Sequence, residues 1–237
     1  MQKAVKRDSA MKFVGVLLLI LAAVLIAVLI ITTSPSIQMW YSRYDDILTR
    51  FENSVASIRY EFVILLVILL LYWVKTFFPI ISISALCFLS GVVFPTFNAL
   101  LVNVTGVLIM LTVKYRIGQS VGGGSARRLL SKNALSKFLV ELEGDGNPWL
   151  LFVCRLIPAF PINPVSQMYG SMNFDFRRFT ILSFLGMAPK ILSYTVIGHN
   201  VFNPLSWQFF LPIIILLTIS GASVLGLNAL INYFDKV

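Results

Sequence analysis

The strongest constraint on the fold is a proline-rich stretch at residues 155–170, RLIPAFPINPVSQMYG, which lies between two apolar segments. Pro158, Pro161 and Pro164 remove backbone hydrogen-bond donors and prevent a continuous helix. The apolar segments on both sides are hydrophobic enough to lie at membrane depth. Broken backbone in a bilayer requires cover by protein or by a water-filled cavity, so the stretch predicts a re-entrant loop. Arg155 would then be a buried cation, and such residues mark transport paths in membrane proteins.

Composition supports a membrane protein. Hydrophobic residues make up 58% of the 237 residues and charged residues 12%, which excludes an ordinary soluble domain and predicts an all-α polytopic membrane protein. The formal net charge of +9 fits basic cytoplasmic loops or contacts with anionic headgroups. No soluble basic module is present that would bind nucleic acid. Cys87 and Cys154 lie in apolar surroundings, as core residues do.

The distribution of apolar residues predicts four regions. Residues 1–33 form an N-terminal transmembrane helix, because the apolar run at 13–31 is longer than the core of a signal peptide. Residues 34–61 repeat apolar side chains at steps of three and four, which predicts an interfacial amphipathic helix. Residues 62–200 form the core, and residues 201–237 form a C-terminal transmembrane helix.

The core carries one spacing pattern twice. In four residue pairs, eleven residues lie between the two members: Pro79 and Gly91, Phe94 and Gly106, Pro158 and Gly170, Phe174 and Gly186. We therefore predict two re-entrant hairpin-plus-helix repeats, with hairpins at about residues 79–95 and 155–172. If one helix, at about 96–113, crosses between them, the repeats are inverted, and transporters place substrate where such repeats meet.

Prolines and glycines are expected to shape the hairpins and the helices that follow. They are Pro79, Gly91, Pro95, Pro158, Pro161, Pro164, Gly170, Gly186 and Pro189. The central loop at 114–147 contains a segment, 125–143, with apolar and basic residues at helical spacing. This pattern predicts a second interfacial helix that lies against anionic lipid.

The charges expected at membrane depth are all positive, because every acidic residue lies at or outside a predicted membrane boundary. A planar guanidinium suits a phosphate group, and amides of broken backbone add donors. The predicted substrate-binding residues are Arg155, Asn163, Gln167, Lys190, Lys75 and Asn98. Lys75, at the end of its helix, also fits a lysine that extends to the headgroups. The three amides could equally serve only to satisfy broken backbone.

The chain lacks the residues of common enzymes. It has one histidine, His199, which excludes a multi-histidine metal site. No G-x-S-x-G motif and no pair of carboxylates at membrane depth is present. We therefore expect no catalytic residue, no metal and no cofactor.

The residues around the proline-rich stretch resemble a family signature. The pattern Arg155-x-x-Pro158-x-x-Pro161-x-Asn163, followed by Gly170, Phe179, Gly186, Pro189 and Gly198, is similar to that of the DedA/VTT-domain membrane proteins, the SNARE-associated Golgi protein family. The likeness covers about residues 60–200. The resemblance implies two opposed re-entrant loops and a transporter or scramblase of lipids, with phospholipid or polyprenyl phosphate as substrate.

One departure from the family bears on mechanism. Many of its members carry acidic residues in the first hairpin, whereas this chain has none between Glu61 and Glu141. A scramblase or facilitator in the cell membrane is therefore favoured over a proton-coupled pump, with membrane lipids as partners. An ion-coupled transporter of a small solute and a non-transporting scaffold of membrane organisation stay open, as does a homo-oligomer. Orientation also stays open, because basic residues at 3–12 and 114–137 both favour the cytoplasm but the predicted crossings separate them.

Overall fold

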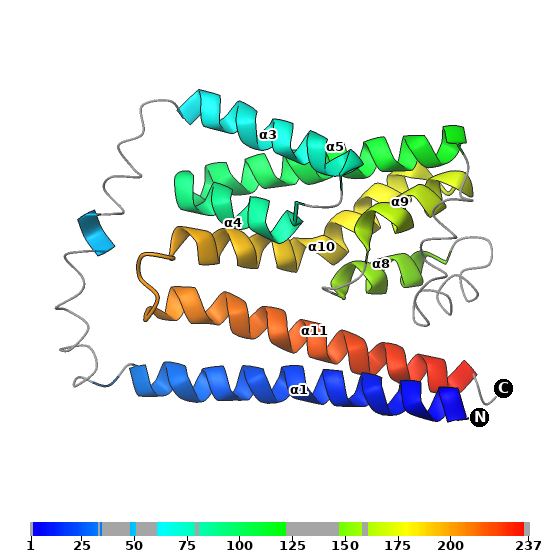
Figure 1. Ribbon diagram of the computed structural model, residues 1–237, viewed down its shortest axis with the longest axis horizontal. Coiled ribbons are helices and arrows are strands. Elements are labelled where there is room, and N and C mark those ends of the chain that lie inside the picture. Colours follow the sequence, from blue (N-terminus) through cyan, green and yellow to red (C-terminus); the bar gives the residue numbers. More distant parts are fainter. Residues whose placement is uncertain are drawn as a thin grey trace. The chain divides into compact units, whose positions relative to one another are not determined.

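The computed structural model describes residues 2–32, 34, 48–50, 61–78, 81–121, 147–157 and 161–234, and the regular structure in this part of the chain is helical throughout (Figure 1). The all-α prediction is confirmed for these residues. The helices are α1 (Gln2–Thr32), α3 (Glu61–Phe77), α4 (Ile83–Val93), α5 (Thr96–Val121), α8 (Pro148–Leu156), α9 (Ile162–Ser171), α10 (Phe176–His199) and α11 (Trp207–Phe234).

Helix length separates two classes. Among the described residues, α1, α5, α10 and α11 are long and apolar enough to cross a membrane. The other four helices have 17, 11, 9 and 10 residues. At 1.5 Å per residue, even the longest of these spans about 25 Å, less than a hydrocarbon core of about 30 Å. The protein is therefore an integral membrane protein with several apolar helices. Among the described helices, four are long enough to cross a membrane, and four are shorter over their described lengths.

The chain divides into two compact units, which are described separately. The terminal unit comprises Met1–Glu61, Cys87–Leu100 and Pro189–Val237, and the central unit comprises Phe62–Leu86 and Leu101–Ala188. Each unit thus combines segments that are far apart in the sequence.

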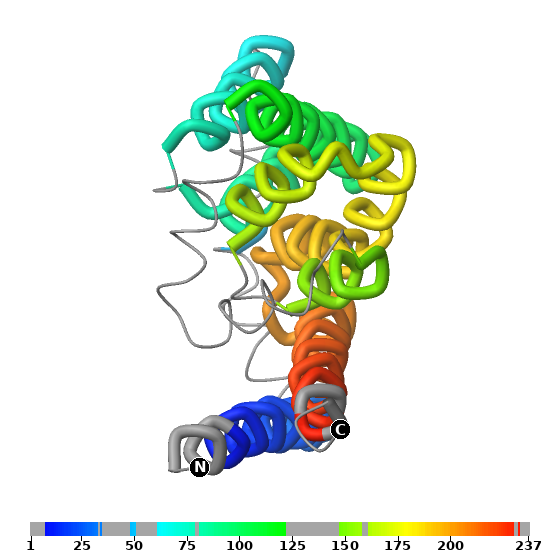
Figure 2. The backbone as a smooth tube through the Cα atoms, turned by 90° about the vertical axis from the view of Figure 1, so that its right-hand side faces the viewer, coloured from blue at the N-terminus to red at the C-terminus, as the bar shows by residue number. Residues whose placement is uncertain are grey.

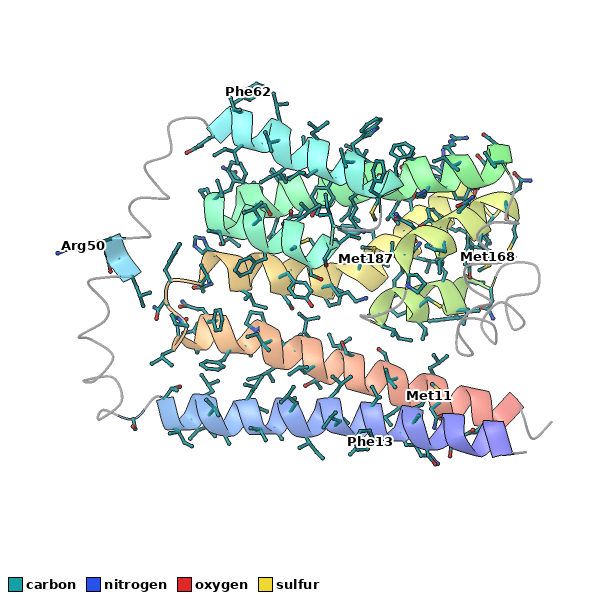
Figure 3. All side chains as sticks on the ribbon, in the orientation of Figure 1. Met11, Phe13, Arg50, Phe62, Met168 and Met187 are labelled. Carbon is teal, nitrogen blue, oxygen red and sulfur yellow. The ribbon has the colours of Figure 1, made fainter. Side chains whose placement is uncertain are left out.

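In the terminal unit, α1 packs along α11 (Figures 1 and 2). One carboxylate of α1 binds α11: Asp8 accepts hydrogen bonds from Asn228 at 2.8 Å and from Asn232 at 2.6 Å, both on α11. Met11 is buried on the side of α1 that faces α11, whereas Phe13 points away and is 68% exposed (Figure 3). The exposed apolar face of α1 is suited to contact with lipid chains.

Two helix crossings, one in each unit, share one geometry. In the terminal unit, a Cβ added at Gly91 of α4 would lie 2.1 Å from the carbonyl oxygen of Thr195, and one at Gly198 of α10 would lie 2.1 Å from that of Phe88. Backbones that approach this closely leave no room for a side chain, which is why small residues occur at helix crossings in membranes. In both contacts the carbonyl belongs to the residue three positions before the glycine of its own helix.

The crossing in the central unit repeats this arrangement on α5 and α9. A Cβ at Gly118 of α5 would lie 2.0 Å from the carbonyl oxygen of Gln167, and one at Gly170 of α9 would lie 2.0 Å from that of Tyr115. Again each carbonyl precedes a crossing glycine by three residues. The internal geometry of the two crossings thus matches, helix for helix, in the way that a duplicated sequence would produce.

One expected boundary is wrong. The crossing expected to end at 113 continues as α5 to Val121, because Gly118 packs closely on α9 and the hydroxyl of Tyr115 donates to the carbonyl of Phe174. The described part of 79–95, where the first hairpin is expected, holds one helix, α4, and α3 ends before it at Phe77.

The helix that enters the second expected hairpin, at about 155–172, is α8, which begins at Pro148. Asn147 caps this arm and Pro148 occupies its first turn, so a dipeptide typical of turns starts a helix here. The helix expected at 125–143 lies outside the described residues, and so does most of the amphipathic helix expected at 34–61.

Candidate functional site

The proline-rich stretch forms the turn of a helical hairpin made by α8 and α9 (Figure 1). α8 ends at Leu156, and α9 begins at Ile162 immediately after Pro161. Pro164 lies in the first turn of α9, where no backbone donor is required. The hydroxyl of Tyr169 donates to the carbonyl of Asn147 at 2.6 Å, so the end of α9 lies beside the start of α8. The two helices therefore run in opposite directions.

Arg155 lies in the last turn of α8 and is only 1% exposed. Its Nε donates to Ser183 Oγ at 3.2 Å, Nη1 donates to the carbonyl of Ile162 at 2.9 Å, and Nη2 donates to Ser166 Oγ at 2.8 Å. The guanidinium carbon lies 5.8 Å from the centre of the Phe179 ring. One side chain thus connects the end of α8 to the start of α9 and to Ser183, about two turns into α10. It uses the fixed fork of donors that only arginine provides.

Gly186 explains how α8 approaches α10 so closely. A Cβ at this position would lie 2.5 Å from Cβ of Arg155 and 2.9 Å from the carbonyl oxygen of Phe152. The absence of a side chain on α10 therefore positions the stem of Arg155. Because Ser183 lies one turn before Gly186, the guanidinium meets its hydroxyl partner on the same helix.

Asn163 joins the start of α9 to the end of α3. Its Nδ2 donates to the carbonyl of Thr76 at 3.2 Å and to that of Lys75 at 3.4 Å. These carbonyls belong to the last turn of α3 and have no acceptor role within that helix, so the amide satisfies them. The side chain of Lys75 is 9% exposed and that of Thr76 is fully buried.

Five residues at the ends of α3, α8 and α9 form a cluster, the helix-end junction: Lys75, Thr76, Arg155, Asn163 and Ser166. All five belong to the central unit, and four of them are at least nine-tenths buried. The junction places two cations, Lys75 and Arg155, in the last turns of two of the shorter helices, α3 and α8. The partial negative charge of a helix C-terminus favours both cations.

Three other predicted residues are not part of the junction. Gln167 is half-buried on α9, and its backbone carbonyl rather than its side chain makes the contact with α5. Lys190 and Asn98 belong to the terminal unit, where Lys190 is half-buried in α10 and Asn98 is exposed in the first turn of α5. The structure thus connects Arg155, Asn163 and Lys75 from the predicted set, and the binding role of all six stays a prediction.

The prolines have separate positions. Pro95 precedes the first turn of α5, and Pro189 lies inside α10 without ending it. Pro79 and Pro158 lie outside the described residues.

Sequence reasoning missed the two serines that bind the guanidinium, Ser166 and Ser183. Their only sequence signal is a polar residue within an apolar helix, which many serines of this chain share. Neither is exposed. Within the described residues, no group of three or more His, Cys, Asp or Glu side chains could hold a metal ion.

The chain was compared with known proteins. A model of the VTT domain matches residues 78–200, just over half of the chain. The chain is 28% identical over 137 residues to the Golgi apparatus membrane protein TVP38 of Eremothecium gossypii, covering 56% of this chain and 44% of that protein. It is 23% identical over 133 residues to the uncharacterised protein YqeD of Bacillus subtilis, covering 56% of this chain and 64% of that protein.

The matched segment spans less than two thirds of the length of either relative. No solved structure matches the chain. The matched residues include α4, α5, α8, α9 and α10, and with them the whole hairpin that carries Arg155. On the extent of this match, the protein belongs to the VTT-domain family, also called the DedA family.

Proposed function

We propose that this protein moves an anionic, phosphate-bearing lipid, a phospholipid or a polyprenyl phosphate, between the leaflets of a cell membrane. The supporting observation is the helix-end junction, where Lys75 and Arg155 are buried in the last turns of α3 and α8. Both helix ends bind α9, α3 through Asn163 and α8 through Arg155. Buried cations in an apolar protein favour an anionic ligand, and lipid phosphate is the most abundant anion beside a membrane-embedded site. Movement needs no chemical step, and we propose that the protein is not an enzyme.

Downhill movement fits the charges better than a pump. Asp175 is the only acidic residue among the described residues of the central unit, and it is exposed at the start of α10. Its carboxylate accepts a hydrogen bond from the backbone of Arg178 at 2.8 Å, as a helix cap does. A proton-coupled cycle ordinarily uses a carboxylate within the membrane. We therefore propose a scramblase or facilitator.

The short helices are proposed to be the arms of two re-entrant hairpins, α3 with α4 and α8 with α9, each followed by a crossing helix, α5 or α10. The matching glycine crossings support this duplication, because Gly91 and Gly170 occupy the same place in the sequence repeat. In transporters built from inverted repeats, substrate binds where broken helices meet. The helix-end junction joins one broken helix of each proposed hairpin.

We propose on this architecture an orientation for the chain, which the sequence left open. If α3 and α4 together enter and leave by one face, the described helices that cross the membrane are α1, α5, α10 and α11. The N-terminal basic residues and the basic segment at 114–137 then lie on the same side, in agreement with the positive-inside rule.

The topology predicts a labelling result. Single cysteines at Ser9 and Ser136, in a variant with Cys87→Ala and Cys154→Ala, are expected to react from the same side of intact cells, and a cysteine at Asn203 from the other side. Accessibility to a membrane-impermeant maleimide measures this. Labelling of the first two positions from opposite sides would contradict the proposed hairpins.

Reconstitution tests the function directly. The purified protein in liposomes is expected to expose fluorescent phosphatidylglycerol of the inner leaflet to dithionite faster than in protein-free liposomes, with no ion gradient present. A matched experiment with fluorescent polyprenyl phosphate identifies the preferred lipid. Uptake of a small solute that depends on an ion gradient, without lipid movement, would instead identify a solute transporter. If the intact, folded protein moves neither lipid nor solute, the result would favour a non-transporting scaffold.

A further inference from the structure

The end of α3 carries a second feature, which involves a lysine that the sequence analysis did not select. Lys114 lies on α5, is half-buried, and places its Nζ 5.8 Å from the centre of the Phe77 ring in the last turn of α3. Lys75 is in the same turn of α3 and is nine-tenths buried. Two ammonium groups therefore lie near one helix end.

The packing of α3 on α5 explains why both lysines reach this helix end. The ring of Tyr72 fills the space above Gly106, and its hydroxyl donates to Asn103 at 3.0 Å. Lys75 follows Tyr72 by three residues, so it lies on the same face of α3, toward α5. Lys114 lies two turns beyond Gly106, and helical side chains tilt toward the N-terminus, which directs its ammonium back toward the end of α3.

These charges have no counter-ion in the described structure. In the part of the chain that the structure describes, neither ammonium group forms an ion pair or a hydrogen bond. The nearest compensation is the carbonyl end of α3, two of whose carbonyls Asn163 already occupies. Two like charges that are partly withdrawn from water without an anion are unfavourable, and an anion that binds between them relieves this cost.

Depth in the membrane indicates the source of the anion. α5 has 26 residues, so it is about 39 Å long, close to the full thickness of a bilayer with its headgroups. Lys114 lies seven residues before the end of α5 at Val121, about 10 Å along the axis. If α5 is centred in the bilayer, this places the backbone of Lys114 about 6 Å inside a hydrocarbon core of about 30 Å. The anion within reach at this depth is the phosphate of a lipid drawn below the headgroup layer.

The surface beside the two lysines is aromatic and exposed. Trp73, Phe77 and Phe78 are 50%, 47% and 59% exposed, and the rings of Trp73 and Phe77 are 5.1 Å apart in an edge-to-face arrangement. Aromatic side chains at this level bind the glycerol and upper acyl region of lipids. The cationic pair can thus contact the charged headgroup of an amphipathic ligand, and the aromatic surface beside it can contact the apolar chains.

We propose that Lys75 and Lys114 form an anion site that holds the phosphate of a lipid while its acyl chains lie against Trp73, Phe77 and Phe78. The proposal deepens the proposed function, on which its role in transport rests, and it assigns direct phosphate contact to these lysines. Arg155, whose guanidinium already donates to Ser166, Ser183 and the carbonyl of Ile162, is then a residue that positions the hairpin.

The test uses Trp73 as the reporter. In the full-length protein with Trp40, Trp149 and Trp207 replaced by phenylalanine, brominated phosphatidylglycerol in phosphatidylcholine vesicles is expected to quench Trp73 more strongly than brominated phosphatidylcholine does. Each cation close to an anionic lipid contributes about fivefold in affinity, so the preference is expected to fall about fivefold for Lys75→Gln or Lys114→Gln and to vanish for the pair.

Matched variants separate charge from packing. Lys75→Arg and Lys114→Arg are expected to keep the preference, and Arg178→Gln, an exposed cation of the same unit, is expected to leave it unchanged. Circular dichroism and gel filtration check that each variant is folded. If the double variant does not fold, Lys114→Gln alone decides, because its side chain is only half-buried.

Specific outcomes overturn the anion site. Equal quenching by both lipids in the parent protein would do so, as would a preference that survives in the folded double variant. Loss of the preference when millimolar inorganic phosphate is added would assign the lysines to a soluble anion and overturn the lipid assignment. Lipid movement measured in the same vesicles keeps the two proposals apart. A preference without movement overturns the proposed function alone, and movement without a preference overturns the anion site alone.

Discussion

Replacing Gly170 with alanine is expected to lower the free energy of unfolding by about 1–3 kcal/mol, the usual cost of overpacking, although alanine is the better helix former. The added Cβ would lie 2.0 Å from the carbonyl oxygen of Tyr115. A backbone oxygen within a helix cannot move aside as the tip of a flexible side chain can. The two helices must therefore separate, which also loosens the opposing contact of Gly118 with Gln167. Equilibrium unfolding in mixed micelles, followed by circular dichroism, measures the change.

Gly226 provides the matched control. It lies in α11, is exposed, and a Cβ added there would meet nothing within 4 Å. Gly226→Ala is therefore expected to leave stability unchanged or to raise it by up to about 1 kcal/mol through helix propensity. Gly91→Ala tests the corresponding crossing of the terminal unit and is expected to match Gly170→Ala. Equal stability of Gly170→Ala and Gly226→Ala would contradict the close crossing.

Arg155→Lys is expected to destabilise the protein strongly even though it conserves the charge. One ammonium group cannot reproduce three directed bonds to Ser183, Ser166 and the carbonyl of Ile162. Each hydrogen bond to a charged group contributes about 1.5–3 kcal/mol, and the loss of one or two of them is the expected effect. Unfolding midpoints in mixed micelles measure it, and the liposome assay shows whether lipid movement falls in parallel.

The comparison with Arg178→Lys isolates the effect of burial. Arg178 is exposed near the start of α10, and its conservative replacement is expected to change stability by less than about 0.5 kcal/mol. A positioning role for Arg155 predicts that stability and lipid movement fall together in Arg155→Lys. Full stability with impaired movement would instead indicate direct contact with the substrate, and full stability with normal movement would exclude both roles.

Several features could be predicted from the sequence because they depend on local chemistry. Long apolar runs predicted the helices observed as α1 and α11, and the prolines predicted the interruption between Leu156 and Ile162. The scarcity of acidic residues predicted cations without carboxylate neighbours, which stays a prediction. Each inference depends on the composition of one segment: the transfer free energy of an apolar run, the backbone donors that prolines lack, or the number of acidic residues.

Other features required the fold. The polar residues at 114–121 read as a loop, yet they continue α5 because Tyr115 and Gly118 contact the hairpin. Asn147 and Pro148 read as a turn, and only the presence of a helix after them makes the asparagine a cap. Sequence selected Arg155 as a buried cation that binds a phosphate, and the structure surrounds its guanidinium with hydroxyl and carbonyl groups of the protein.

By itself, the sequence determined that this chain is helical, lies in a membrane, and breaks its backbone at a proline-rich point beside a cation. Only the tertiary structure decided which groups satisfy that cation and which lysine, Lys114, joins Lys75 at the end of α3. The reason is physical: membrane partition depends on the composition of a segment, whereas a hydrogen bond depends on the positions of two groups that the chain separates by many residues.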